Sequence, residues 1–164
     1  RCLMHVNRRH CLKTSAAAGL ALSAWPVFGA ATPGRKARTA LSGCGWWGNN
    51  ILREAMASGA CEVVALCDVD SRQFEATLKN VAAGTGDAPK TYKDYREMLD
   101  QAKPEIVIVG TPDHWHALPM IAAVEAGADV YVEKPISVDV VEGQAMVAAA
   151  RKHGRVHLDR HRWS

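Results

Sequence analysis

Short runs of apolar residues recur along this chain, and longer stretches with apolar residues at helical spacing separate them. Val63–Cys67, Glu105–Gly110 and Asp129–Val132 are rich in β-branched residues and stay nearly continuously apolar. Such runs are typical of strands that are buried on both faces of a parallel sheet. A shorter, small-to-apolar stretch at Thr39–Leu41 predicts a further strand ahead of them.

The stretches between these runs predict helices. Apolar residues recur every three or four positions in them, as Phe74, Leu78 and Val81 do, and Gly154 stands where the last helix should end. Strands that alternate with helices predict an α/β fold, a doubly wound parallel sheet of the Rossmann type over residues 39–154. The predicted helices cover Asn49–Ser58, Asp70–Ala83, Tyr92–Ala102, Ala117–Ala126 and a segment that is capped by Ser137 or Asp139 and ends at His153.

Three chemically informative stretches follow predicted strands. They are Gly43–Gly48, Thr111–His116 and Glu133–Pro135. The carboxyl ends of parallel strands meet at one edge of a doubly wound sheet, and ligands bind outside that edge. We therefore expect one site at which all three stretches converge.

The first stretch is a G-x-G-x-x-G run that lies between a predicted strand and a predicted helix. In a dinucleotide-binding fingerprint Gly43 would allow a tight turn, Gly45 would let the backbone approach a pyrophosphate, and Gly48 would let the helix pack closely on the strand. The helix N-terminus then offers N–H groups and a partial positive charge to the phosphates. Asp68 ends the next strand, 20 residues past Gly48, where an acid can accept hydrogen bonds from a ribose. The run predicts nucleotide binding, and the alternative is a glycine-rich turn that binds nothing.

Lys134 is the leading candidate for acid–base chemistry. It follows an apolar strand, where folding does not require a charged side chain. Beside a nicotinamide ring, its ammonium group could hydrogen-bond a substrate hydroxyl or carbonyl and help to move its proton. Glu133 is expected to pair with Lys134 and hold it in place, while Pro135 stiffens the chain after the strand. The alternative is an ordinary surface pair at a strand end.

Two histidines and two tryptophans lie in the same stretches. His114 and His116 have only one residue between them and no third ligand at suitable spacing, so no metal site is predicted. His116 is expected to touch nucleotide or substrate. Trp46 and Trp47 lie inside the glycine run, where they could cover a dinucleotide or mark the fit of this loop to its own ligand.

Charge is divided unevenly along the chain. Residues 1–38 carry seven Lys and Arg and no acid, whereas residues 39–164 carry thirteen Lys and Arg against seventeen Asp and Glu, a net charge of −4. A nucleic-acid-binding face is therefore not predicted. The three cysteines after residue 38 form an odd set at irregular spacing, which favours buried thiols over disulfides or a zinc site.

The basic N-terminal part has the features of a targeting segment. Arg8 and Arg9 form a pair ahead of Thr14–Ala31, an Ala-rich run too polar for a stable membrane span, and Thr32–Arg38 has the composition of a linker. This pattern resembles a twin-arginine (Tat) signal and predicts export to the periplasm or cell envelope. The alternatives are an ordinary secretory signal and a retained N-terminal anchor.

Taken together, these motifs resemble the N-terminal half of the Gfo/Idh/MocA oxidoreductases, the family of glucose-fructose oxidoreductase and inositol dehydrogenase. The resemblance covers about Ala37–Gly154 and rests on Gly43–Gly48, Val64–Asp70, Thr111–His116 and Glu133–Pro135. It implies NAD or NADP bound in a Rossmann domain, and the oxidation or reduction of a sugar, polyol or related hydroxyl compound. It also implies that full-length relatives are homo-oligomers.

The resemblance gives roles to individual residues. Lys134 matches the catalytic lysine of the family's Glu-Lys-Pro motif, with Glu133 beside the cofactor. Thr111, Pro112 and His116 match the motif on the cofactor side, and His116 is also a candidate for catalysis. NAD is the expected cofactor because of Asp68, although Arg72 could meet the 2′-phosphate of NADP.

The chain also departs from the family. The family's second domain, which supplies much of the substrate pocket, would follow residue 154, and Arg155–Ser164 is rich in Arg and His where an apolar strand is expected. We interpret this tail as truncated or frame-shifted. The expectation is a nucleotide-binding chain without efficient turnover of its own, and the sequence leaves its status as an enzyme open. The alternatives are a stand-alone nucleotide-binding module, an NAD-dependent glycosidase of the same family, or a methyltransferase-like domain.

Overall fold

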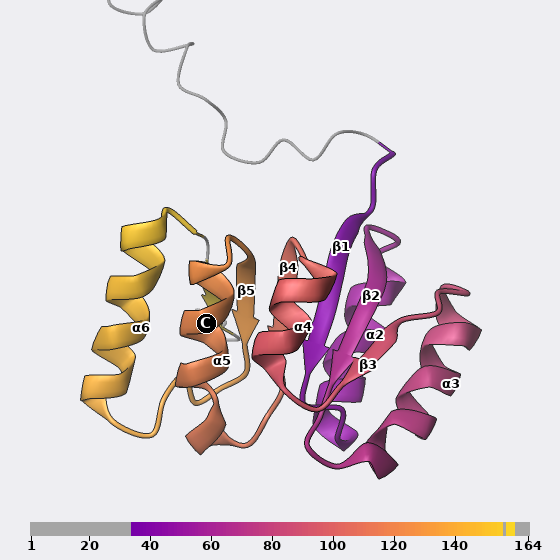
Figure 1. Cartoon of the computed structure of the whole chain (residues 1–164), viewed down its shortest axis with the longest axis horizontal. Coiled ribbons are helices and arrows are strands. Elements are labelled where there is room, and N and C mark those ends of the chain that lie inside the picture. Colours follow the sequence, from indigo (N-terminus) through magenta and orange to yellow (C-terminus); the bar gives the residue numbers. More distant parts are fainter. Residues whose placement is uncertain (1–33, 156, 160–164) are drawn as a thin grey trace, which may run out of the picture. The chain divides into compact units, whose positions relative to one another are not determined.

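The computed structural model describes residues 34–155 and 157–159, and those from Arg35 onward belong to one α/β unit (Figure 1). Most of the predicted leader, residues 1–33, lies outside the described part, as do residues 160–164 of the tail. Ala37 and Arg38, which were predicted to belong to the linker, already form the start of the first strand. Within the described residues, no helix has the length and apolar character needed to cross a membrane.

The strands form one parallel sheet in the order β3-β2-β1-β4-β5-β6. This order is typical of dinucleotide-binding doubly wound sheets and confirms the predicted fold class. The strands are β1 (Ala37–Ser42), β2 (Cys61–Cys67), β3 (Lys90–Tyr92), β4 (Ile106–Val109), β5 (Asp129–Val132) and β6 (His157–Asp159).

Helices cover both faces of the sheet (Figure 1). Helices α2 and α3 pack on one face, and α4 and α5, with α6 against α5, pack on the other. Each face of the sheet carries a buried apolar cluster. Strand β4 contributes to both, because Val107 and Val109 pack into one cluster and Ile108 packs into the other, so the strand is apolar throughout. The helices are α2 (Trp46–Ala57), α3 (Phe74–Gly84), α4 (Tyr95–Ala102), α5 (Ala117–Glu125) and α6 (Val140–His153), with short 3₁₀ turns η2 (Ser71–Gln73) and η3 (Asp113–Trp115).

A capping side chain and a glycine mark the two ends of α6. Asp139, rather than Ser137, caps α6 through a hydrogen bond from the Glu142 N–H at 2.8 Å. Gly154 ends the same helix with φ of 61°, a left-handed conformation that glycine adopts without strain. The boundaries of α6 therefore follow from two short-range signals.

Three elements differ from the sequence-based prediction. Helix α2 begins at Trp46, inside the glycine run, because Gly45 already serves as its N-terminal cap position. Residues 90–92 form β3 instead of opening a helix at Tyr92, since their backbone pairs with the end of β2. Strand β6 forms beside β5 where the Arg- and His-rich composition argued against a strand. Both missed strands are three residues long, so backbone pairing with a neighbour decides them rather than a pattern of side chains.

Candidate functional site

A cleft with a volume of about 1180 Å³ opens at the carboxyl ends of the strands. This edge of the sheet lies at the bottom of Figure 1. All three predicted stretches converge there, and the predicted residues that line the cleft are Gly43, Gly45, Trp46, Trp47, Asp68, Thr111, Pro112, Glu133 and Lys134. A smaller adjoining pocket of about 400 Å³ shares Gly43, Asp68, Val69 and Thr111 with the cleft and adds residues such as Tyr95 and Trp115.

The glycine run is packed as its spacing predicts. Gly43 has φ of 94°, and a Cβ atom there would lie 2.6 Å from the backbone nitrogen of Thr111. A Cβ on Gly48 would lie 1.9 Å from the carbonyl oxygen of Gly43, so only glycine lets α2 approach the turn this closely. A Cβ on Gly45, by contrast, meets no atom within 4 Å. Gly110 was not predicted as a site residue, yet its Cβ would come within 2.8 Å of the Gly48 Cα atom.

Two polar side chains outside the predicted set fix the carbonyl groups of this loop. Asn49 Nδ2 donates to the Cys44 carbonyl at 2.7 Å and to Thr77 Oγ1 at 2.9 Å. The buried Thr77 hydroxyl in turn lies 3.2 Å from the same carbonyl oxygen. Among the described residues, no side chain caps the N-terminus of α2, which faces the cleft with its partial positive charge. An uncapped helix start beside glycines is a ready anion site.

Asp68 is tied to the glycine loop as well as exposed to the cleft. Its Oδ2 atom accepts a hydrogen bond from the Cys44 N–H at 2.7 Å, and Oδ1 accepts one from the Asp70 N–H at 2.9 Å. A carboxylate can accept about four hydrogen bonds, so these two leave room for ribose hydroxyls. Arg72, the candidate partner of a 2′-phosphate, does not line the cleft and donates to Asp70 instead.

Glu133 and Lys134 differ sharply in their surroundings. Glu133 is 4% exposed, and neither of its carboxylate oxygens has a hydrogen-bond partner among the described residues. Lys134 is exposed and lines the same cleft. The predicted pair between the two is therefore wrong, because neither carboxylate oxygen of Glu133 accepts a hydrogen bond from Lys134. Within the described part, the cleft wall thus holds a buried carboxylate that lacks a donor.

His116 lies behind the cleft wall and is fully buried. Its Nδ1 atom is 2.7 Å from the Pro135 carbonyl oxygen, and its Nε2 atom is 2.9 Å from the Thr111 carbonyl oxygen. The imidazole therefore bridges the two loops that follow β4 and β5. The predicted contact between His116 and nucleotide or substrate would require it to leave these carbonyl groups.

The remaining predicted side chains lie at the surface of the site. Trp46 is 77% exposed, and its ring centroid lies 5.2 Å from that of Trp47 with a tilt of 43°. Both indoles line the cleft. His114 is exposed next to Trp115, and no group of three potential metal ligands occurs in the described residues.

The cysteines of the site are buried thiols, as predicted. Burial raises the pKa of Cys44 and of Cys67 to about 12, and the neighbouring Asp68 carboxylate acts in the same direction. Thiols with such a high pKa are poor nucleophiles at neutral pH. The Cys44 side chain thus contributes packing under the glycine loop rather than chemistry.

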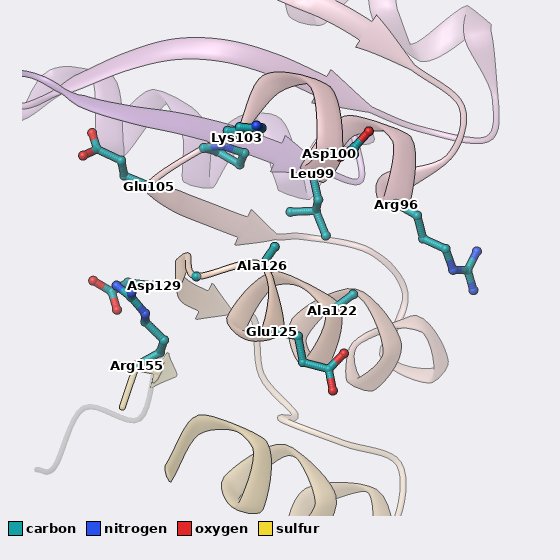
Figure 2. A pocket seen from close by; sticks show the side chains of 12 residues that line it. Arg96, Leu99, Asp100, Lys103, Glu105, Ala122, Glu125, Ala126, Asp129 and Arg155 are labelled. Atoms are coloured by element: carbon teal, nitrogen blue, oxygen red, sulfur yellow. The ribbon is translucent and has the colours of Figure 1, made fainter. Parts of the chain in front are cut away.

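A second cavity of about 940 Å³ lies at the opposite edge of the sheet, between the ends of α4 and α5 (Figure 2). Its labelled side chains include charges of both signs, such as Arg96, Lys103, Glu105 and Glu125. None of the predicted site residues lies there, and ligands of doubly wound sheets bind at the carboxyl ends of the strands. The cleft beside the glycine run is therefore the better candidate.

Comparisons with known proteins agree with this geometry. The family described as "Oxidoreductase family, NAD-binding Rossmann fold" (Gfo/Idh/MocA) matches residues 37–160. A glycosyl hydrolase family 109 protein of Stenotrophomonas maltophilia is 37% identical over 78% of this chain and 29% of the relative. An inositol 2-dehydrogenase of Salmonella typhimurium is 30% identical over 72% of this chain and 34% of the relative.

A solved structure shares the fold as well as the sequence. The WlbA dehydrogenase of Chromobacterium violaceum, in complex with NADH and UDP-GlcNAcA, is 32% identical with a TM-score of 0.65, over 78% of this chain and 36% of that protein. The chain thus spans about a third of the length of the relatives it matches. By its family match and its fold, this chain belongs to the Gfo/Idh/MocA oxidoreductases and forms their NAD-binding Rossmann domain.

Proposed function

We propose that this domain serves an oxidoreductase that exchanges hydride between NAD and a CH–OH carbon of a sugar or polyol. The observation that carries the proposal is the shared cleft. Three features open into it: the start of α2, which no side chain of the described residues caps, the buried Glu133 carboxylate, which has no donor among these residues, and the exposed Lys134. The relatives named inositol 2-dehydrogenase and WlbA dehydrogenase support the substrate class.

The residues of the cleft fit a dinucleotide. The start of α2, with Gly45 in open space, would hold the diphosphate. Asp68 would accept from the hydroxyls of the adenosine ribose, and the adjoining pocket with Val69 and Trp115 would take the adenine. Glu133 lacks donors in the described structure, and the hydroxyls of the second ribose would supply them.

Lys134 is the proposed proton-handling group. The bound nicotinamide would supply the hydride chemistry of the reaction. The Lys134 ammonium group would hydrogen-bond the substrate oxygen and take or return its proton as the oxygen changes between hydroxyl and carbonyl. The exposed Trp46 and the partly buried Trp47, which both line the cleft, would exclude water from the cofactor.

Asp68 also favours NAD over NADP. Its carboxylate lies where the adenosine ribose would bind, and an anion there repels a 2′-phosphate. Asp70, two residues further along, lines the same cleft and adds a second negative charge. We therefore expect weaker binding of NADP than of NAD.

The test is a titration of the purified chain with NADH, followed by tryptophan fluorescence and by thermal unfolding. We expect quenching and a raised Tm, because a ligand that binds only the native state stabilises it. Lys134→Met should bind NADH as the wild type does but should lose hydride exchange when introduced into a full-length relative. A well-folded sample with neither quenching nor thermal protection refutes the proposal.

A second candidate is an NAD-dependent glycosidase. It is favoured by the 37% identity to a glycosyl hydrolase family 109 protein. A glycosidase that uses its nicotinamide only transiently needs a cofactor that stays bound throughout purification. Stoichiometric cofactor that does not exchange with labelled NAD would support this candidate, whereas free exchange supports the dehydrogenase.

We also propose export through the Tat-like leader and assembly of the full-length protein into homo-oligomers. The Arg8–Arg9 pair supports the first proposal, and Tat transport of folded proteins suits a domain that takes up its nucleotide before export. Replacing both arginines by lysine in a reporter fusion should keep the reporter in the cytoplasm. Unchanged export would refute the Tat assignment.

A further inference from the structure

The turn after β2 contains an aspartate and an arginine that bind each other closely. Arg72 Nε donates to both carboxylate oxygens of Asp70, at 2.9 and 3.1 Å, and Arg72 Nη2 donates to Oδ2 at 2.8 Å. The backbone N–H of Arg72 also donates to Oδ1 at 3.0 Å, which makes Asp70 the cap of η2. One carboxylate thus receives four contacts from a single residue.

This turn lies at the point where a dinucleotide-binding fold distinguishes its two cofactors. An acid at the end of the second strand reads the ribose 2′-OH of NAD, and an arginine nearby accommodates the 2′-phosphate of NADP. Asp68 is that acid, and Asp70 lines the cleft two residues later. Arg72 is the arginine, but its side chain is 88% exposed and does not line the cleft.

We propose that Asp70 is a specificity-determining residue: it holds the guanidinium of Arg72 away from the 2′ position of the adenosine ribose and so keeps the site selective for NAD. The inference rests on the proposed function, since it needs a dinucleotide whose ribose lies at Asp68. The inference adds that the arginine that could bind the 2′-phosphate of NADP is already present as Arg72, and that its guanidinium is bound by the Asp70 carboxylate.

The tightness of this pair is not a consequence of its sequence spacing alone. Asp94 and Arg96 have the same spacing, and Asp94 likewise accepts the Arg96 backbone N–H, at 2.8 Å. The Arg96 guanidinium, however, approaches Asp94 only to 3.5 Å and stacks over the Tyr95 ring at 4.6 Å. Hydrogen bonds from Arg72 lower the pKa of Asp70 to about 2, so the pair stays charged at neutral pH. The Asp70–Arg72 turn therefore differs from a matched turn in the same chain.

The test compares Asp70→Asn and Asp70→Ser with the wild type. Both substitutions keep a side-chain oxygen that can cap η2, and both remove the carboxylate that binds the guanidinium. Affinities for NADH, NADPH and adenosine 2′,5′-bisphosphate are measured by fluorescence titration. We expect NADPH and the bisphosphate to bind about tenfold more tightly, as a new charged hydrogen bond allows, with NADH changed less than about twofold.

Further variants separate the release of Arg72 from the mere loss of a negative charge. In Asp70→Asn/Arg72→Gln the gain for NADPH should disappear. The control Glu75→Gln removes a carboxylate that pairs with Lys79 and lines neither pocket, so it should leave all three affinities unchanged. An equal gain with and without Arg72, or no gain in either single variant, overturns the inference while NADH binding stands. If wild-type protein does not bind NADH, the proposed function fails together with the inference.

Discussion

The glycine run gives a sharp test of the structure, because its second and third glycines have opposite surroundings. Gly48→Ala places a methyl group 1.9 Å from the Gly43 carbonyl oxygen, whereas real Cβ atoms stay at least about 3 Å from such atoms. Helix α2 must therefore move about 1 Å away from the turn, and it carries the buried side chains Ile51 and Leu52 with it. Overpacking of this kind costs about 1–3 kcal/mol.

Gly45→Ala is the matched control three residues earlier. Its new Cβ meets no atom within 4 Å, and the backbone φ of −65° suits alanine. The substitution should leave the free energy of unfolding unchanged or raise it by about 0.4–1 kcal/mol, since alanine restricts the unfolded chain. Because Gly45 lines the cleft, the same methyl group should weaken NADH binding by about tenfold or more.

The assay is thermal unfolding followed by far-ultraviolet circular dichroism, without ligand, together with an NADH titration. A loss of about 2 kcal/mol in Gly48→Ala should lower Tm by about 4–8 °C for a chain of this size. The two variants should thus separate, one losing stability and the other losing affinity. Equal melting of both variants, or wild-type melting of Gly48→Ala, would show that the packing of α2 against the turn is wrong.

Three further predictions follow from buried polar groups. Glu133→Gln should stabilise the ligand-free protein by about 1–3 kcal/mol, measured as a raised Tm, because the native carboxylate is buried and has no donor among the described residues. The same variant should weaken NADH binding in a titration, because it lacks the carboxylate that would accept from the ribose hydroxyls. Thr77→Val should cost about 1–2 kcal/mol and weaken NADH binding, and Thr77→Ser should restore both, since the hydroxyl ties the glycine loop. The free energy of unfolding in urea should fall as pH rises from 9 to 12: the pKa values of Cys44 and Cys67 are raised to about 12 in the folded state, so only the unfolded thiols ionise in this window. A Cys44→Ala/Cys67→Ala variant should flatten that decline, and a decline of equal size in the variant would rule out the thiols as its cause.

The sequence was sufficient to predict the fold class, the central strands and the edge of the sheet at which the three stretches converge. Val107, Ile108 and Val109 are apolar because both faces of β4 are covered, and this requirement is visible in the sequence itself. Strands β3 and β6 were missed because each has three residues and pairs along only one side. Their formation depends on the backbone of a neighbouring strand, which periodicity does not record.

Most of the predicted site residues line one cleft, but their hydrogen-bond partners were not predicted. His116 belongs to a motif that suggested contact with nucleotide or substrate, yet its ring bridges the Thr111 and Pro135 carbonyls. Asn49 and Thr77 carry no motif at all, and their function in holding the Cys44 carbonyl depends on two helices that meet only in the folded chain. A residue's type and spacing indicate where it lies, while its hydrogen-bond partners are set by tertiary packing.

The relative positions of the cleft residues are set mainly by the backbone. Gly43 N–H donates to the last carbonyl of β2 at 2.8 Å, Gly110 N–H to the last carbonyl of β1 at 2.8 Å, and Glu133 N–H to the last carbonyl of β4 at 3.1 Å. The first residues of each loop thus remain hydrogen-bonded to the neighbouring strand. The order of the strands therefore determines how far apart the glycine turn and Lys134 lie. Parallel pairing of the strands therefore sets where the three loops of the cleft start. For this reason substitutions at Lys134 or Asp70 should change chemistry or selectivity while the cleft itself persists.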